Sequence, residues 1–137
     1  MIVVDANILA YFWLKSPYFE KVTELYNRDS DWTSPELCKS EFRNILAAYL
    51  RKGYYTSEEA KWLIAQKENK MMGSYLEVDS IEILNLVSQS TCSSYDCEYV
   101  ALAKKTMRPL ITFDKKILQQ FPDVAFTVDQ YLSSLGK

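Results

Sequence analysis

Residues 1–14, MIVVDANILAYFWL, establish the fold class and the first candidate functional residue. Residues 1–4 form a short apolar run rich in β-branched side chains, which is typical of a strand buried on both faces of a sheet. Asp5 ends this run, and the pattern over residues 7–14 predicts the start of a helix. A buried strand followed at once by a helix is the first half of a βαβ unit, and such units build parallel sheets.

The same order of elements returns near the C-terminus. Residues 109–113, PLITF, predict a second buried strand that ends at Asp114 and is followed by a short helix. Residues 125–128 are expected to form a last edge strand, and Asp129 is expected to cap a C-terminal helix.

Helix signals occupy the interval between these strands. Ser34 followed by Pro35 predicts an N-cap and first helical residue, with the helix running to about Lys52 and stopping at Gly53. Residues 94–106 predict another helix. Two pairs with capping-box spacing predict two more: Thr56 with Glu59, and Asp79 with Glu82. We therefore expect residues 1–137 to form a single α/β domain, a Rossmann-like three-layer sandwich with a central parallel sheet of four to five strands and helices on both faces.

The composition excludes several classes of function. The 137 residues include no histidine and only three glycines, widely spaced. Glycine-rich phosphate loops, dinucleotide turns, histidine-based catalytic triads and HExxH zinc sites are thereby excluded.

The net charge of −2 excludes nucleic-acid binding by bulk charge alone, and the three cysteines lack C-x-x-C spacing. The absence of a signal peptide or a bilayer-spanning run predicts a cytoplasmic protein with no membrane partner.

Carboxylates are therefore the expected catalytic groups, and two of them follow the buried strands. Ligands bind outside the carboxyl ends of strands in parallel sheets, so Asp5 and Asp114 are expected at the same edge. The alternative for each is an ordinary N-cap, because Asp is favoured at strand-to-helix junctions.

Two more carboxylates fall on apolar helix faces. Glu41 shares a face with Ile45 and Tyr49, and Asp96 shares one with Val100 and Ala103. The alternatives are a solvated rim position or a paired arginine for Glu41, and a favourable helix-terminus charge for Asp96. Glu98 lies on the opposite face of its helix, beside Lys105, and is expected in solvent.

Convergence of the four carboxylates would require a cation. Two like charges ~5 Å apart at an effective dielectric of ~20 repel by about 3 kcal/mol, and four carboxylates make several such pairs. Either a divalent metal or protonation must relieve this repulsion. Purely oxygen ligands favour Mg²⁺ or Mn²⁺ over zinc.

Four blocks of the sequence together resemble the PIN-domain ribonucleases, and within them the VapC-type toxins of toxin–antitoxin pairs. These blocks are VVDANIL, SEFRNIL, SSYDCEYVALAKK and LITFDKKIL, and the resemblance covers nearly the whole chain. It implies a PIN-domain fold, a homodimer, and a cognate antitoxin that blocks the acidic cleft. The family's acidic quartet falls on Asp5, Glu41, Asp96 and Asp114, and its auxiliary polar positions fall on Asn7 and Thr112. Ala6 departs from the Thr or Ser that is commoner there.

The expected activity is Mg²⁺-dependent endoribonuclease cleavage of RNA phosphodiester bonds by metal-activated water. Asp5 and Asp96 are expected as direct metal ligands, and Glu41 and Asp114 as ligands through water or as groups that orient the attacking water. Asn7 and Thr112 are expected to hold these groups in place. The alternatives are a haloacid-dehalogenase-like phosphatase, disfavoured because Asn7 replaces its second Asp, and a catalytically silent PIN-fold interaction domain.

RNA attraction calls for local cations, since the site itself is acidic. Five cations between positions 104 and 116 are candidates for phosphate contacts, against the alternative of ordinary solvated helix faces: Lys104, Lys105, Arg108, Lys115 and Lys116. The aromatic run Tyr11, Phe12 and Trp13 is assigned to packing.

Overall fold

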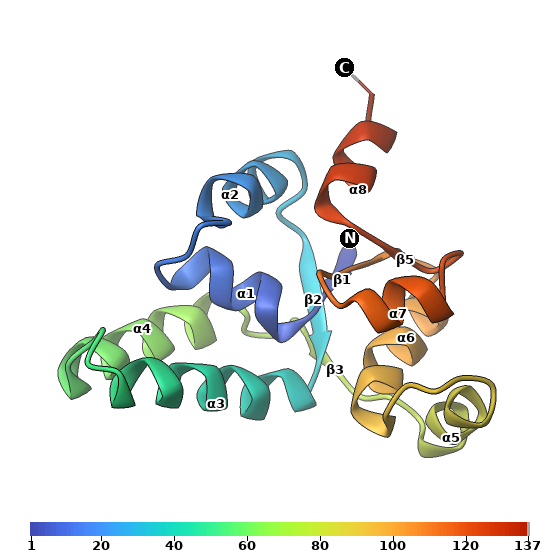
Figure 1. Cartoon of the computed structure of the whole chain (residues 1–137), viewed down its shortest axis with the longest axis horizontal. Coiled ribbons are helices and arrows are strands. Elements are labelled where there is room, and N and C mark those ends of the chain that lie inside the picture. Colours follow the sequence, from blue (N-terminus) through green and yellow to red (C-terminus); the bar gives the residue numbers. More distant parts are fainter. Residues whose placement is uncertain (137) are drawn as a thin grey trace.

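Residues 1–136 are described by the computed structural model and contain five strands and eight helices (Figure 1). In chain order these are β1 (Ile2–Val4), α1 (Ala6–Trp13), α2 (Phe19–Arg28), β2 (Trp32–Pro35), α3 (Leu37–Arg51), α4 (Ser57–Lys70), β3 (Tyr75–Leu76), α5 (Ser80–Ser88), α6 (Ser94–Thr106), β4 (Leu110–Ile111), α7 (Lys115–Gln120), β5 (Ala125–Phe126) and α8 (Val128–Ser134). None of the helices in this part of the chain combines the length and apolar character needed to cross a bilayer.

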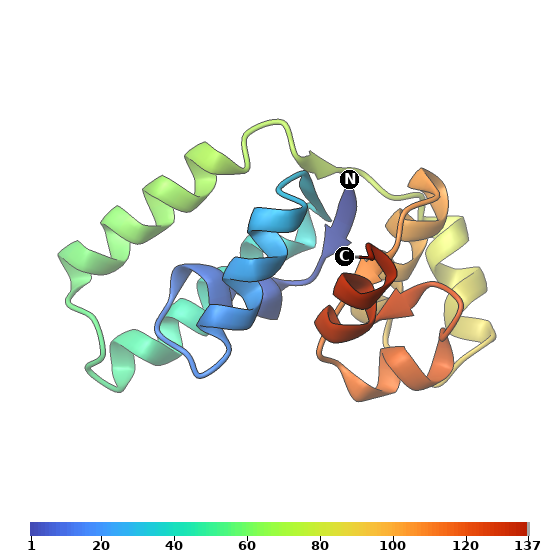
Figure 2. The ribbon, with the colours of Figure 1, turned by 90° about the horizontal axis from the view of Figure 1, so that it is seen from above.

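The five strands form one wholly parallel sheet in the order β3-β2-β1-β4-β5. Val3 pairs with Thr33 of β2 on one side and with Leu110 of β4 on the other, so β1 is the central strand. Helices α1, α2 and α3 lie on one side of the sheet and α5 and α6 on the other (Figure 2). The three-layer α/β fold with a five-stranded parallel sheet is therefore confirmed.

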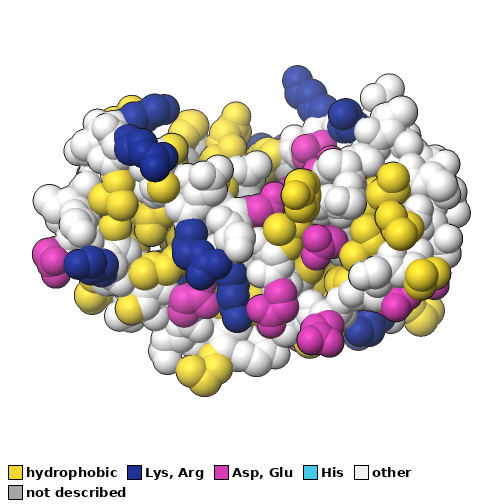
Figure 3. Space-filling model, turned by 90° about the horizontal axis from the view of Figure 1, so that it is seen from below, with side chains coloured by type: hydrophobic (Ala, Val, Ile, Leu, Met, Phe, Trp, Pro, Cys, Tyr) yellow, Lys and Arg dark blue, Asp and Glu magenta, His cyan; other side chains and the backbone are white. Residues whose placement is uncertain are grey.

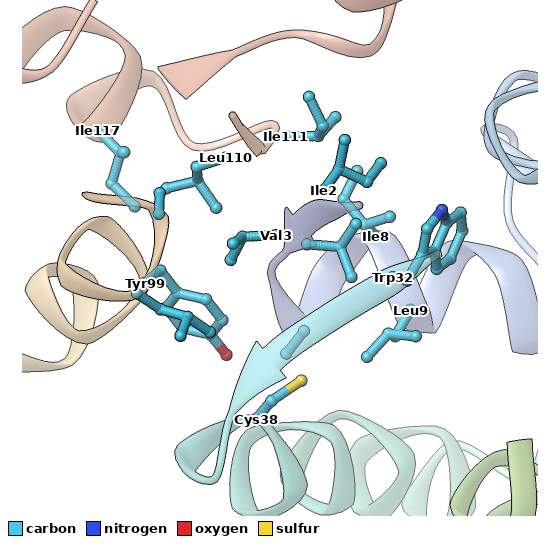
Figure 4. Close-up of a cluster of buried hydrophobic side chains, with 14 of the residues drawn as sticks. Ile2, Val3, Ile8, Leu9, Trp32, Cys38, Tyr99, Leu110, Ile111 and Ile117 are labelled. Carbon is cyan, nitrogen blue, oxygen red and sulfur yellow. The ribbon is translucent and has the colours of Figure 1, made fainter. Parts of the chain in front are cut away.

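The core forms around β1, where Ile2, Val3 and Val4 are fully buried. Residues from both flanking layers close over them, including Ile8 of α1 and Tyr99 of α6 (Figure 4). The continuous apolar pattern of residues 1–4 is explained by this position, because a central parallel strand carries helices on both faces. All three cysteines are free and buried.

The prediction that Ser34 and Pro35 begin a helix is wrong, because both belong to strand β2. Ser34 pairs in register with Tyr75 of β3, and its hydroxyl donates to the carbonyl oxygen of Val4 at 2.5 Å. Helix α3 begins at Leu37, after Glu36, which makes no side-chain cap hydrogen bond. The Ser-Pro signal is local, and sheet pairing overrides it.

Other boundaries near the C-terminus also differ from expectation. Strand β4 covers only Leu110–Ile111, and α8 is capped by Thr127 in a capping box with Gln130. Asp129 is not the cap; it lies in the first turn and accepts a hydrogen bond from Lys21 at 2.9 Å. The predicted caps of α4 at Thr56 and of α5 at Asp79 are confirmed. Helix α2 and strands β2 and β3 were not predicted.

Candidate active site

A cleft of about 250 Å³ opens at the carboxyl ends of β1 and β4. Strand order reverses between these neighbours, which is where parallel α/β sheets bind ligands. Figure 3 views this edge from below and shows acidic side chains near the middle of the face. The cleft is lined by Asp5, Ala6, Asn7, Glu41, Asn44, Ile45, Asp96, Tyr99, Asp114 and Ile117. All four carboxylates singled out in the sequence therefore lie around one cavity.

Asp5 is the most buried of the four, with 7% of its surface exposed. One carboxylate oxygen accepts a hydrogen bond from the backbone N–H of Ile8 at 3.0 Å, which caps helix α1. The other oxygen accepts from the hydroxyl of Thr112, whose own oxygen accepts from the backbone N–H of Asp114 at 2.9 Å. Thr112 therefore links the ends of β1 and β4.

The environment of Asp5 favours its neutral form. Burial raises the pKa of Asp5 to about 6, and the nearby carboxylates of Asp114 and Glu41 add to this effect. The hydrogen bonds from Thr112 and Ile8 act in the opposite direction but do not offset burial. A cation beside Asp5 would restore its charged form, because opposite charge lowers a carboxyl pKa.

Glu41 projects from the first half of α3 at the border of its buried stripe, which consists of Cys38, Phe42 and Leu46. The Tyr99 hydroxyl donates a 2.5 Å hydrogen bond to Glu41, joining α6 to α3 across the cleft. Figure 4 shows this hydroxyl directed from α6 toward the end of β2. Burial and the Asp96 carboxylate raise the pKa of Glu41, while the Tyr99 hydrogen bond lowers it.

Asp96 and Asp114 each lie at the start of a helix. The backbone N–H of Asp96 donates to the Ser93 cap of α6, and its half-buried side chain lines the cleft. Asp114 caps α7 by accepting from Ile117 N–H at 2.9 Å. Asp5 and Asp114 are therefore both N-caps and cleft residues, so the expected position at one edge of the sheet and the alternative of an N-cap are both correct.

Glu98 is not fully in solvent as predicted. It is half-buried, and burial together with the charge of Glu41 raises its pKa. Helix-wheel position alone does not show which neighbouring element covers a residue, and this is why the prediction for Glu98 is wrong.

The donor set suits a hard divalent cation. Within residues 1–136, no Lys or Arg forms an ion pair with any of the four carboxylates. The described residues also contain no group of three or more His, Cys, Asp or Glu side chains placed so that they could hold a metal ion. Mg²⁺ is compatible with that arrangement, since it commonly uses one or two carboxylates and keeps several waters. The oxygen donors of the cleft are therefore of the kind that Mg²⁺ uses, but the described side chains alone do not make up a complete set of ligands.

Not all of the other candidates reach the cleft. Asn7 lines it, whereas the five cations proposed for RNA contact do not. Lys104 and Arg108 border a separate cavity of about 780 Å³ near the far end of α6, and Lys105 donates to the carbonyl oxygen of Glu77. Lys115 and Lys116 are exposed in the first turn of α7, directly after Asp114.

Two polar cleft residues, Tyr99 and Asn44, were missed by sequence reasoning. Tyr99 lies among apolar residues of α6, where a tyrosine has the pattern of a core residue. Asn44 lies one helical turn after Glu41, and this i, i+3 spacing is a signal that could have placed both on one face.

The family model of the PIN domain matches residues 2–126. The chain therefore belongs to the PIN domain family, which confirms the resemblance and does not support the phosphatase alternative. It is 26% identical to Ribonuclease VapC3 of Pyrobaculum aerophilum over 125 residues, covering 88% of this chain and 95% of that protein.

Solved structures share the fold. The crystal structure of FitAcB from Neisseria gonorrhoeae matches with a TM-score of 0.75 at 17% identity, covering 93% of this chain and 98% of that one. The crystal structure of PAE2754 from Pyrobaculum aerophilum matches with a TM-score of 0.69 at 23% identity, covering 98% and 95%. FitAB bound to the IR36 DNA fragment has a TM-score of 0.72 at 16% identity, with 93% of this chain covered.

Proposed function

We propose that this protein is a Mg²⁺- or Mn²⁺-dependent endoribonuclease and the toxin of a VapBC-like toxin–antitoxin pair. The observation that carries the proposal is the cleft at the carboxyl edge of the sheet. Four carboxylates from separate parts of the chain line it, and no described Lys or Arg pairs with them. The similarity to Ribonuclease VapC3 supports RNA as the substrate.

The residues take distinct roles in this proposal. Asp5 and Asp96 would hold the metal directly, while Glu41 and Asp114 would act through water or orient the attacking water. When bound, Mg²⁺ neutralises charge on the phosphate and makes water a stronger nucleophile. Thr112 holds the Asp5 carboxylate through its hydrogen bond, and Asn7 contributes a neutral polar group at the cleft.

Cleavage of total RNA tests the activity, with products mapped by primer extension. Wild-type protein should cut RNA with Mg²⁺ or Mn²⁺ and lose activity with a chelator. Asp5→Asn and Asp96→Asn should abolish cutting, while Asp123→Asn, an exposed aspartate outside the cleft, should leave it unchanged. Persistent cutting by the cleft variants would refute the assignment. Absence of divalent-metal binding by calorimetry would favour a silent interaction domain.

The toxin role has its own test. Induced expression of wild-type protein should arrest growth, and expression of Asp5→Asn should not. Co-expression of a short open reading frame found next to this gene should relieve the arrest, and its product should co-purify with the chain. The similarity to Ribonuclease VapC3 supports the search for such a partner. We also propose a homodimer, which light scattering after gel filtration would detect.

A further inference from the structure

Three aromatic rings beside the acidic cleft form a group that the proposed chemistry does not use. Tyr11 of α1, Tyr18 before α2, and Phe113 between β4 and α7 contact one another, with ring centroids 4.8 to 5.2 Å apart. We call these three residues the aromatic platform. Phe113 lies about a hundred residues along the chain from the two tyrosines, so the platform exists only in the folded chain.

The platform adjoins the cleft through two elements. Phe113 lies between Thr112, which donates to Asp5, and Asp114, which lines the cleft. Tyr11 follows Asn7 by four residues on α1, so both lie on one helix face. The charge of Asp5 contributes to raising the pKa of Tyr11, after burial and Tyr18. The platform therefore adjoins residues of the cleft in the chain and on α1, while its own rings lie outside the cleft lining.

Tyr18 is the outer member of the platform. It is 41% exposed, whereas Tyr11 and Phe113 are half-buried. Its ring packs at 4.8 Å from Tyr11 and 4.9 Å from Phe113, and its backbone N–H donates to the Ser16 hydroxyl at 3.1 Å. A ring held this way binds a flat partner with little loss of side-chain entropy.

The carboxylates of the cleft repel the RNA backbone wherever a bound cation does not neutralise them, so an attraction that does not depend on charge strengthens RNA binding. None of the five candidate cations lines the cleft. Stacking of a base on an aromatic ring supplies such attraction and tolerates any base. We infer that the aromatic platform, through Tyr18, stacks an unpaired nucleobase of the RNA beside the cleft. This inference rests on the proposed ribonuclease function.

The test couples a protein change to an RNA change. Binding of a fluorescein-labelled single-stranded RNA is measured by anisotropy in an Asp96→Asn background, where the proposed function predicts no cutting. Tyr18→Ala should weaken binding about tenfold. An RNA in which the stacked nucleotide keeps its backbone but lacks its base should also bind about tenfold more weakly. The two changes combined should weaken binding no further than either alone, because they delete the same stack.

Matched variants separate stacking from folding. Tyr18→Phe keeps the ring and should bind within about twofold of the parent, while Tyr18→Leu keeps apolar packing and should bind like Tyr18→Ala. Tyr54→Ala, a 60% exposed tyrosine in the turn between α3 and α4, should not change binding. Circular dichroism on heating establishes that each variant is folded.

The possible outcomes distinguish this inference from the function beneath it. Equal RNA affinity for Tyr18→Ala and its parent, or an undiminished base-removal effect in Tyr18→Ala, would overturn the platform even if the wild type cuts RNA. Coupling between Tyr18 and one base without any cutting by the wild type would support the platform and refute the ribonuclease.

Discussion

At the scale of single residues, Asp5 occupies a position that suits a charged carboxylate as a helix cap but is also buried, which disfavours the charge. The residue caps α1 and faces the cleft, yet burial raises its pKa to about 6 from an ordinary value of 3.8. Between these two values the folded state holds the Asp5 proton more tightly than the unfolded state. The stability that Asp5 contributes is therefore complete below about pH 4, falls as pH rises toward 6, and is lost above that.

Removal of the Asp5 charge should consequently stabilise the metal-free protein. Asn at position 5 still accepts from Ile8 N–H and can donate to Thr112. Because one pKa unit corresponds to about 1.4 kcal/mol, Asp5→Asn should raise the free energy of unfolding by up to about 3 kcal/mol near pH 7.5. Urea denaturation with chelator should show this gain shrinking near pH 4. A variant no more stable than wild type at pH 7.5 would contradict the assigned environment.

Thr112 offers a test of pH dependence. Its hydroxyl donates to Asp5 and lowers the Asp5 pKa, so Thr112→Val should raise that pKa further. At Mg²⁺ concentrations below the dissociation constant, cleavage that needs ionised Asp5 should rise with pH through the region near 6, and its midpoint should move to higher pH in the variant. Rate against pH measures this shift. Thr106→Val, which removes a hydroxyl bonded within α6, should leave the midpoint in place.

At the scale of secondary-structure elements, helix α7 depends on its cap because it has only six residues. Asp114 supplies both that cap and one of the cleft carboxylates. Asn caps as well as Asp does, whereas Ala costs about 1 kcal/mol. Both Asp114→Asn and Asp114→Ala should lose cleavage and the charge of Asp114, and Asp114→Ala should be about 1 kcal/mol less stable than Asp114→Asn because Ala cannot cap. Equal urea-denaturation midpoints for the two variants would show that the cap contributes nothing.

Sequence signals for a helix start were correct where the side chain that gives the signal also makes the capping hydrogen bond. Thr56 with Glu59 forms a reciprocal capping box, and the positions of Asp5 and Asp114 follow directly from buried strands. Ser34 failed as a helix signal because its hydroxyl bonds to a strand thirty residues earlier. Helix–strand boundaries set by distant pairing are not encoded in the nearby sequence.

The residues of the candidate cleft likewise fall into those that the local sequence predicts and those that only the fold reveals. Its four carboxylates could be predicted, since charged residues on apolar faces or after buried strands stand out in a sequence. Tyr99 could not, because its hydrogen bond to Glu41 forms only when the sheet brings α6 and α3 to opposite sides of one cleft. Tyr11 was assigned to packing, which is correct, but its contact with Tyr18 and Phe113 required the fold.

At the scale of the whole molecule, the parallel sheet assembles the cleft from residues 5, 41, 96 and 114. Folding therefore brings together carboxylates that are far apart in the unfolded chain and repel each other in the folded one. The raised pKa values of Asp5 and Glu41 are consistent with this repulsion, although burial is the larger cause for both. Any cation that binds this cleft binds the folded state in preference to the unfolded state.

Divalent metal should then stabilise the entire fold. At a concentration ten times its dissociation constant, Mg²⁺ should add about 1.4 kcal/mol to the free energy of unfolding, which raises Tm by roughly 3 to 6 °C for a chain of this size. Differential scanning fluorimetry near pH 7.5 would measure this rise. Asp96→Asn should reduce it, Asp123→Asn should retain it, and wild-type protein near pH 5 should lose it because Asp5 is protonated there. A Tm rise of equal size at both pH values would place the metal outside the cleft, because binding there has to displace the Asp5 proton.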